Sequence, residues 1–191
     1  MHQLPPAPRP IGIFNNYLAT GPETLMLKEK MMSLSGDSFD IKLASGQPIF
    51  KIAGRHMTAS GRKSVYDCGG NHLFDIVKEH FHLHRTYAAK DARGNVFMTV
   101  KSSITFVGSK ATAEFTSTQG RREVLTMRGD WMDKSVGIVC DSGETVAAID
   151  RKLLSVRELM GVQRYALHVA PGVDLALMVA LCVAFDEANN D

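Results

Sequence analysis

The chain has 191 residues, 45% of them hydrophobic, so it is long enough to bury the core of a single domain. Its formal net charge of +2 at pH 7 is too small to indicate a nucleic-acid-binding surface, although it is compatible with local basic patches. The cysteines Cys68, Cys140 and Cys182 lie far apart, a pattern that argues against a disulfide framework and predicts an intracellular, cytoplasmic protein.

The N-terminus is rich in proline. Four of the seven prolines lie within the first ten residues, which contain no apolar run typical of a signal peptide. We therefore expect residues 1–20 to be a flexible, Pro-rich arm, and residues 21–191 to form one domain. The weaker alternative is that this segment is itself a ligand for an aromatic-lined groove of another protein, because Pro5 to Pro8 gives only a single P-x-x-P match.

Five similar glycine turns divide residues 25–169 into short runs rich in Val, Ile, Phe, Thr and Tyr. Such runs predict antiparallel strands, and glycine permits the positive φ that tight hairpin turns require. Five hairpins and outlying strands give ten to twelve strands, which as an open sheet would expose edges, so a closed barrel or a sandwich is predicted. The turn glycines recur every 23 to 26 residues: Gly46, Gly70, Gly94, Gly120 and Gly143.

Signatures of catalysis are sparse. The chain lacks a G-x-x-x-x-G-K-[ST] phosphate loop, a G-x-S-x-G elbow and a C-x-x-C pair. His80, His82 and His84 alternate, and on a strand they would share one face and could bind a metal. However, their surroundings are more typical of a turn and supply no fourth ligand, so a solvated polar face is favoured. We expect no cofactor, no metal and no enzymatic activity.

Basic pairs lie beside several predicted turns or strand ends. Arginine can bind phosphate through two N–H groups, so a few basic residues on one rim of a barrel could hold an anionic head group. The alternative is an ordinary solvated surface with scattered charges. The candidate anion-binding residues are Arg121, Arg122, Arg151 and Lys152.

The C-terminus contains eleven consecutive apolar residues, Leu175 to Phe185, followed by two acidic residues. A helix that is apolar on all sides must be buried, and about 17 Å of helix is too short to cross roughly 30 Å of hydrocarbon. Asp174 is the predicted N-cap. Only a closed barrel would surround such a helix, so we predict a mainly β fold: a closed antiparallel barrel of about twelve strands with a buried central C-terminal α-helix.

Two segments near the C-terminus resemble the LURP-one-related family of the tubby C-terminal-like superfamily. They are residues 138–152, IVCDSGETVAAIDRK, and residues 165–174, YALHVAPGVD, which precede the apolar helix. Residues 39–54 and 67–76 resemble the first hairpins of the family, so the resemblance extends from about Leu25 to Ala188. It implies a twelve-stranded barrel threaded by the C-terminal helix. The superfamily includes phosphoinositide-binding tubby domains and phospholipid scramblases, whereas most LURP-one-related members have no assigned activity.

A helix inside the barrel would leave no room for an internal ligand, so we expect function on the outer surface. The first hypothesis is a non-enzymatic intracellular binding module that engages phosphoinositides, an anionic membrane surface or a protein partner. The second is a scramblase-like, membrane-associated lipid protein, which the short apolar run disfavours. The third is a hydrolase, supported only by the three histidines. We expect neither a nucleic-acid partner nor a transmembrane span.

Overall fold

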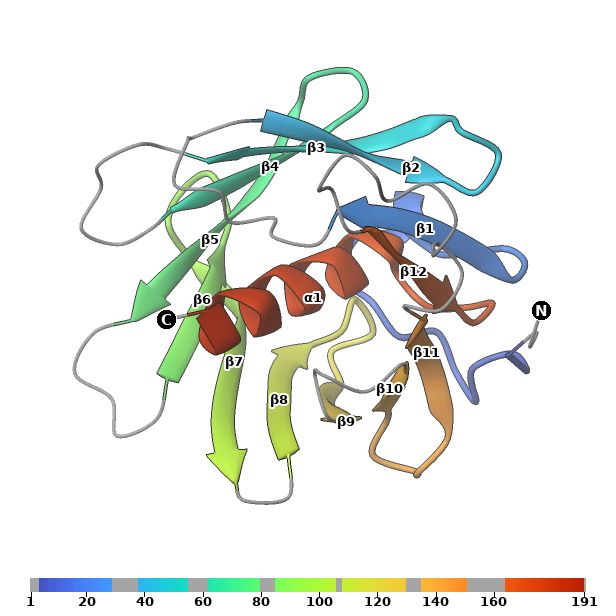
Figure 1. Cartoon of the computed structure of the whole chain (residues 1–191). Coiled ribbons are helices and arrows are strands. Elements are labelled where there is room, and N and C mark those ends of the chain that lie inside the picture. The colour runs from blue at the N-terminus through green and yellow to red at the C-terminus, as the bar shows by residue number, and fades with distance from the viewer. Residues whose placement is uncertain are drawn as a thin grey trace.

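The protein is a closed β-barrel built around a C-terminal helix (Figure 1). The computed structural model describes residues 4–28, 38–54, 62–79, 85–105, 108–129, 135–150 and 164–190. Within these ranges it contains twelve strands, the helix α1 (Leu175–Asn190) and a short 3-10 helix at Asn15–Tyr17. The predicted fold is therefore confirmed. The strands are β1 (Glu23–Lys28), β2 (Ser38–Leu43), β3 (Pro48–Gly54), β4 (Lys63–Asp67), β5 (His72–Glu79), β6 (Arg85–Lys90), β7 (Val96–Thr105), β8 (Gly108–Thr116), β9 (Arg122–Gly129), β10 (Ser135–Val139), β11 (Thr145–Asp150) and β12 (Arg164–Val169).

Each strand pairs with its neighbours in sequence, and β1 closes the barrel against β12. The closing pair is antiparallel and extends from Glu23 opposite Val169 to Lys28 opposite Arg164. Side chains alternate between the inside and the outside with the period of two that strands impose. On β3, for example, Phe50 and Ile52 are buried, while Lys51 between them is exposed.

The five predicted glycine turns are all present and share one geometry. In each turn the glycine N–H donates a hydrogen bond to the carbonyl oxygen of the residue three positions before it. The N–H of that earlier residue donates to the carbonyl oxygen of the residue directly after the glycine. The glycine φ lies between 73° and 95°, the left-handed region that glycine adopts without steric cost. Because successive strands run in opposite directions, these turns lie at the same end of the barrel. We call this end, together with residues 170–174 where α1 begins, the turn end.

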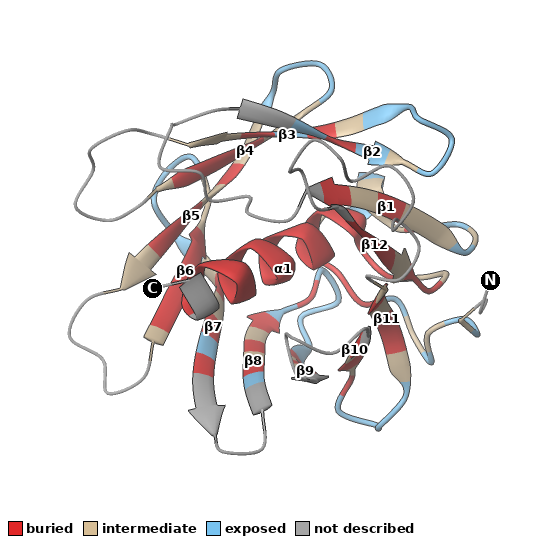
Figure 2. Cartoon of the chain, viewed as in Figure 1, coloured by how far each residue is buried: buried red, intermediate tan, exposed pale blue. Residues whose placement is uncertain are grey.

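Helix α1 fills the inside of the barrel. Every residue from Leu175 to Ala188 is buried, as the continuous red of the helix in Figure 2 shows. The predicted N-cap is confirmed, because Oδ1 of Asp174 accepts hydrogen bonds from Ala176 N (2.9 Å) and Leu177 N (3.1 Å). None of the helices in the described part of the chain is long and apolar enough to span a membrane.

The N-terminal segment packs across the turn end, which differs from the flexible arm that we expected. Ala7 N donates to Pro171 O, Ile11 N to Gly172 O and Ala19 N to Val173 O, each at 2.9 Å. Proline favours an extended backbone and lacks an N–H, so these bonds are made by Ala7 between the prolines and by Ile11 and Ala19 after them, while Pro5, Pro6, Pro8 and Pro10 stay exposed. Residues 4–19 are referred to below as the arm.

Gly12 provides a test of this packing. A Cβ atom at Gly12 would overlap the Cβ atom of Asp174 and lie 3.0 Å from its Oδ2 atom. We expect Gly12→Ala to lower the free energy of unfolding by about 1–3 kcal/mol, because either the arm or Asp174 must move. Gly21→Ala is the matched control, since no heavy atom lies within 4 Å of that Cβ position. Urea unfolding of both variants measures the difference, and equal midpoints would contradict the close approach.

Candidate functional site

The interior of the barrel is occupied by protein side chains. From Ala176 to Phe185 no residue of α1 is more than 1% exposed, and inward side chains of the strands pack around them. This packing supports the expectation that ligands are bound on the outside.

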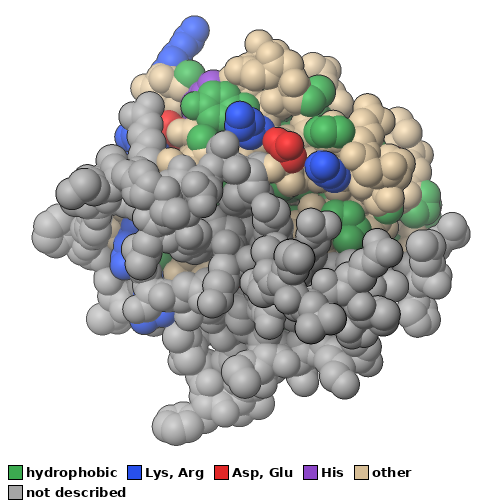
Figure 3. Space-filling model, turned by 45° about the horizontal axis from the view of Figure 1, so that its top comes forward, with side chains coloured by type: hydrophobic (Ala, Val, Ile, Leu, Met, Phe, Trp, Pro, Cys, Tyr) green, Lys and Arg blue, Asp and Glu red, His purple; other side chains and the backbone are tan. Residues whose placement is uncertain are grey.

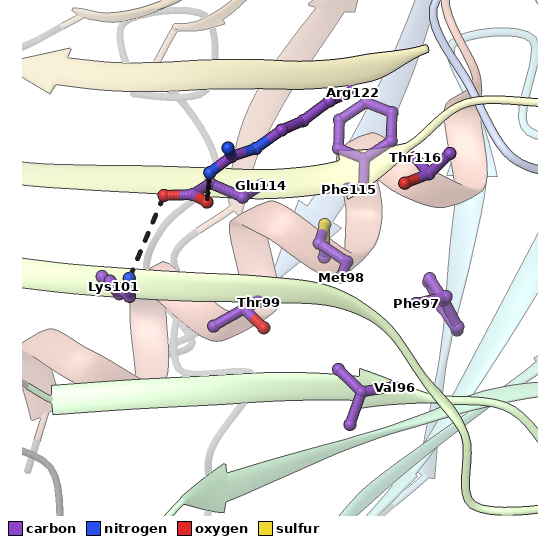
Figure 4. A pocket seen from close by; sticks show the side chains of 9 residues that line it. All are labelled: Val96, Phe97, Met98, Thr99, Lys101, Glu114, Phe115, Thr116 and Arg122. Atoms are coloured by element: carbon purple, nitrogen blue, oxygen red, sulfur yellow. Dashed lines mark hydrogen bonds and ion pairs between the residues drawn. The ribbon is translucent and has the colours of Figure 1, made fainter. Parts of the chain in front are cut away.

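The outer faces of β7, β8 and β9 form a shallow hollow of about 340 Å³, which we call the outer pocket (Figure 4). Strand pairing places Thr99 opposite Glu114 and Thr116 opposite Arg122, so these side chains project from the same outer face. The pocket thus combines charged groups with the carbon atoms of neighbouring strand residues. Its lining residues are Val96, Phe97, Met98, Thr99, Lys101, Glu114, Phe115, Thr116 and Arg122.

Two basic groups share one carboxylate in the outer pocket. Arg122 Nη2 donates to Glu114 Oε2 at 2.6 Å, and Lys101 Nζ lies 3.9 Å from Glu114 Oε1 (dashed lines in Figure 4). The hydrogen bond from Arg122 lowers the pKa of Glu114, so the carboxylate is ionised at neutral pH. The three side chains together carry one excess positive charge. Arg122 is 76% exposed and Lys101 54%, so both can reach a ligand in solution.

Arg121 takes part in a different cluster at the turn end. Its Nε lies 3.6 Å from Glu123 Oε1 and its Nη2 3.5 Å from Asp141 Oδ2. Arg9 of the arm binds the same two acids, donating to Glu123 at 3.0 and 2.6 Å and also to Asp141. The hydrogen bond from Arg9 lowers the pKa of Asp141. We call Arg9, Arg121, Glu123 and Asp141 the arm clamp.

Sequence reasoning missed three members of the arm clamp, namely Arg9, Glu123 and Asp141. One signal was present: Arg9 is the only Lys, Arg, Asp or Glu among the first 22 residues. Its partners could not be inferred because Glu123 lies 114 residues away and Asp141 lies 132 residues away. Glu123 is only 1% exposed, so the two N–H groups of Arg9 offset the cost of burying its carboxylate.

Of the four candidate anion-binding residues, the structure describes Arg121 and Arg122. Arg121 and Arg122 contact different acids, and Arg151 and Lys152 lie outside the described residues, as do His80, His82 and His84. Arg151 follows Asp150, where β11 ends opposite Ser135 at the end of the barrel remote from the turn end. Figure 3 shows the described basic side chains dispersed over one face, with an acidic side chain between two of them. Among the described residues, no group of three or more His, Cys, Asp or Glu side chains could hold a metal ion.

Comparison with known proteins identifies the family. Residues 23–186 match the family model described as LURP-one-related. The chain belongs to the LURP-one-related family. The match begins at the first residue of β1 and ends within α1, so it spans the barrel and most of the helix.

Relatives of this LURP-one-related chain include two proteins of Arabidopsis thaliana. LURP-one-related 15 is 22% identical to this chain, and the alignment covers 97% of this chain and 90% of the relative. LURP-one-related 10 is 21% identical and covers 92% and 95%, respectively. An X-ray structure of a protein from Arabidopsis thaliana superposes with a TM-score of 0.64 at 18% identity, and the match covers 94% of this chain and 99% of that one. This structural match shows a shared fold.

Proposed function

We propose that this LURP-one-related protein is a non-enzymatic binding module whose outer pocket engages anionic phospholipid head groups, including phosphoinositides. The observation that carries the proposal is the exposed guanidinium of Arg122 beside Lys101, with a single carboxylate between them. A guanidinium and an ammonium group on the same face of the sheet suit a phosphate, which accepts hydrogen bonds from both. The packed interior supports an external site.

Glu114 need not prevent phosphate binding. Exposed ion pairs contribute about 0–1 kcal/mol to stability, so a phosphate can replace the carboxylate as the partner of Arg122 at little cost. Of the residues proposed from the sequence, Arg122 therefore belongs to the site. Arg121 is already held by two carboxylates of the arm clamp, and Arg151 and Lys152 stay candidates for a contact elsewhere. The scramblase-like alternative requires α1 to enter lipid, and the burial of α1 does not favour it.

Vesicle sedimentation tests this proposal. We expect the protein to bind phosphatidylcholine vesicles that contain a phosphoinositide, and binding should weaken as salt is added. The double variant Lys101→Ala and Arg122→Ala should bind several-fold more weakly, because each basic residue near an anionic surface contributes about 1 kcal/mol. Vesicles with phosphatidylserine in place of phosphoinositide would distinguish general charge from head-group recognition.

The matched control is the double variant Lys51→Ala and Arg93→Ala, which removes the same charge from exposed positions on β3 and on the turn between β6 and β7. This control should retain most of the binding. Equal binding to neutral vesicles, or no binding to anionic vesicles at low ionic strength, would exclude the lipid proposal. An equal loss in both double variants would exclude the outer pocket as the contact.

A further inference from the structure

The arm is held at the turn end by contacts typical of a bound peptide. Its arginine, Arg9, forms a bidentate pair with Glu123, a carboxylate that is only 1% exposed. Arginine and aromatic residues that fill buried positions provide much of the affinity at protein interfaces. The arm supplies both kinds of residue within nine residues, Arg9 to Tyr17.

Two aromatic side chains of the arm contact aromatic residues of the barrel. Phe14 lies 5.6 Å from both Phe74 and Phe97, measured between ring centroids, and is stacked on the first and edge-on to the second. Tyr17 lies 5.0 Å from Phe50 in an edge-on arrangement. Phe50 and Phe74 are buried residues of β3 and β5. The turn end therefore offers aromatic contacts to the arm in addition to the buried carboxylate of Glu123.

The backbone of the arm is recognised as well. Asp174 Oδ2 accepts hydrogen bonds from Ile13 N at 2.9 Å and Phe14 N at 2.7 Å. Gly12 O accepts a hydrogen bond from Thr118 N at 3.1 Å, on the turn between β8 and β9. The barrel thus binds one arginine, two aromatic rings and two consecutive N–H groups of this segment.

The arm is separable from the barrel in its connectivity. In the described ranges, the arm pairs with the rest of the chain through two isolated bridges, Ile11 with Val173 and Leu18 with Asp174, and belongs to none of the twelve strands. The barrel closes from Glu23 onward, which is also where the family match begins. Between the arm and β1 lie three residues, of which Thr20 and Pro22 are exposed.

We propose that the turn end of the barrel is a peptide-binding site, and that the chain's own residues 4–19 occupy it in cis. The ligand that it fits has an arginine in an extended stretch, an aromatic residue five residues later and, after one 3-10 turn, a second aromatic residue eight residues after the arginine. A partner protein with such a segment competes with the arm. A short tether gives the arm an effective concentration in the millimolar range. The partner segment therefore binds well only when the arm has been released or when the partner's concentration exceeds this effective concentration.

An exchange experiment on the full chain tests this site. A protease recognition sequence is inserted between Thr20 and Gly21, and the folded protein is then cut there. We expect the cut protein to keep its cooperative thermal transition and to exchange its arm for a fluorescent peptide of residues 1–19, followed by anisotropy. Peptides with Arg9→Ala or Phe14→Ala should bind at least about tenfold more weakly. Asn16→Ala is the control peptide and should bind like the original, since Asn16 is exposed.

A second measurement uses the uncut chain. Full-length Arg9→Ala should bind the fluorescent peptide more tightly than the unmodified chain does, because its own arm competes less. Unfolding on cutting, or failure of a large peptide excess to displace the cut arm, would show that the arm is part of the core and overturn the proposal. Equal binding of all peptides would also overturn it. If uncut chains instead form dimers by exchanging arms, a second copy is the occupant and the partner proposal is wrong.

Discussion

A chain that ends at Pro171 is expected not to fold. Truncation removes α1, whose residues from Ala176 to Phe185 are at most 1% exposed inside the barrel. Burial of one large apolar side chain contributes about 1.5–3 kcal/mol, so the helix as a whole contributes on the order of 10 kcal/mol before conformational entropy is counted. A domain typically has a net stability of only about 5–15 kcal/mol. The barrel would also expose its apolar inner face to water.

Single substitutions give a graded version of this prediction. Leu181→Ala removes part of a side chain that is 0% exposed, and we expect it to lower the free energy of unfolding by about 2–5 kcal/mol. Thr116→Ala, at an exposed position of β8, is the control and should change stability by no more than about 0.5 kcal/mol. Circular dichroism and thermal unfolding of the truncated chain and of the two single variants check these expectations against the unmodified protein. A cooperative transition in the truncated chain would rule out a central structural role for α1.

The barrel and its helix could be predicted because their signals are local. An apolar run with no polar face can only be buried, and a glycine in each turn marks where a strand reverses. The cap at Asp174 was predictable for the same reason, since it lies directly before the run. The second role of Asp174 was not predictable, because Ile13 and Phe14 are 161 and 160 residues away in sequence.

The arm shows where sequence reasoning fails. Its prolines exclude regular secondary structure, and we interpreted this as a lack of order. The structure instead fixes the segment through side chains and through backbone N–H groups, most of which follow the prolines, at a surface that exists only after the barrel has closed. Such contacts have no sequence periodicity from which they could be inferred.

The basic residues illustrate a different problem. Charge placement selected Arg121 and Arg122 together, but Arg121 belongs to the turn whereas Arg122 begins β9 with its side chain outward. Two of their acidic partners are distant in sequence and were not apparent from it: Glu114 on β8 for Arg122, and Asp141 on the turn between β10 and β11 for Arg121. The direction of the strands was a usable signal, since the glycine turns mark one end of the barrel. Strand β11, which precedes Arg151 in the sequence, starts at such a turn and therefore ends, at Asp150, at the opposite end of the barrel.

Replacement of Asp174 by alanine is expected to lower the free energy of unfolding by about 3–5 kcal/mol. Asp174 is 0% exposed, and burial raises the pKa of its carboxyl group, while four backbone N–H groups oppose this shift. Oδ1 caps α1, and Oδ2 holds the arm at Ile13 and Phe14. Loss of a helix cap costs about 1 kcal/mol, and each buried N–H left without an acceptor costs about 1–3 kcal/mol.

Asp174→Asn separates the two roles. Asparagine has nearly the same shape but one carbonyl oxygen, so it can accept hydrogen bonds from the helix or from the arm, but not from both. Because asparagine is a good N-cap, we expect it to keep the helix cap and to turn its NH₂ group toward the donors of the arm. The arm should then detach while the barrel stays folded. Chymotrypsin should cut this variant at Phe14 and Tyr17 faster than the unmodified chain.

Urea unfolding and the rate of chymotrypsin cleavage together distinguish loss of the cap from loss of the arm. The alanine variant should show a lower midpoint and rapid cleavage, whereas the asparagine variant should show a smaller shift in midpoint with comparable cleavage. Asp40→Asn, at an exposed position of β2, is the control and should behave like the unmodified chain in both measurements. If Asp174→Asn also matched the unmodified chain in both, the hydrogen bonds to Ile13 and Phe14 would not be what holds the arm. The arm clamp and the aromatic contacts would then have to hold it alone.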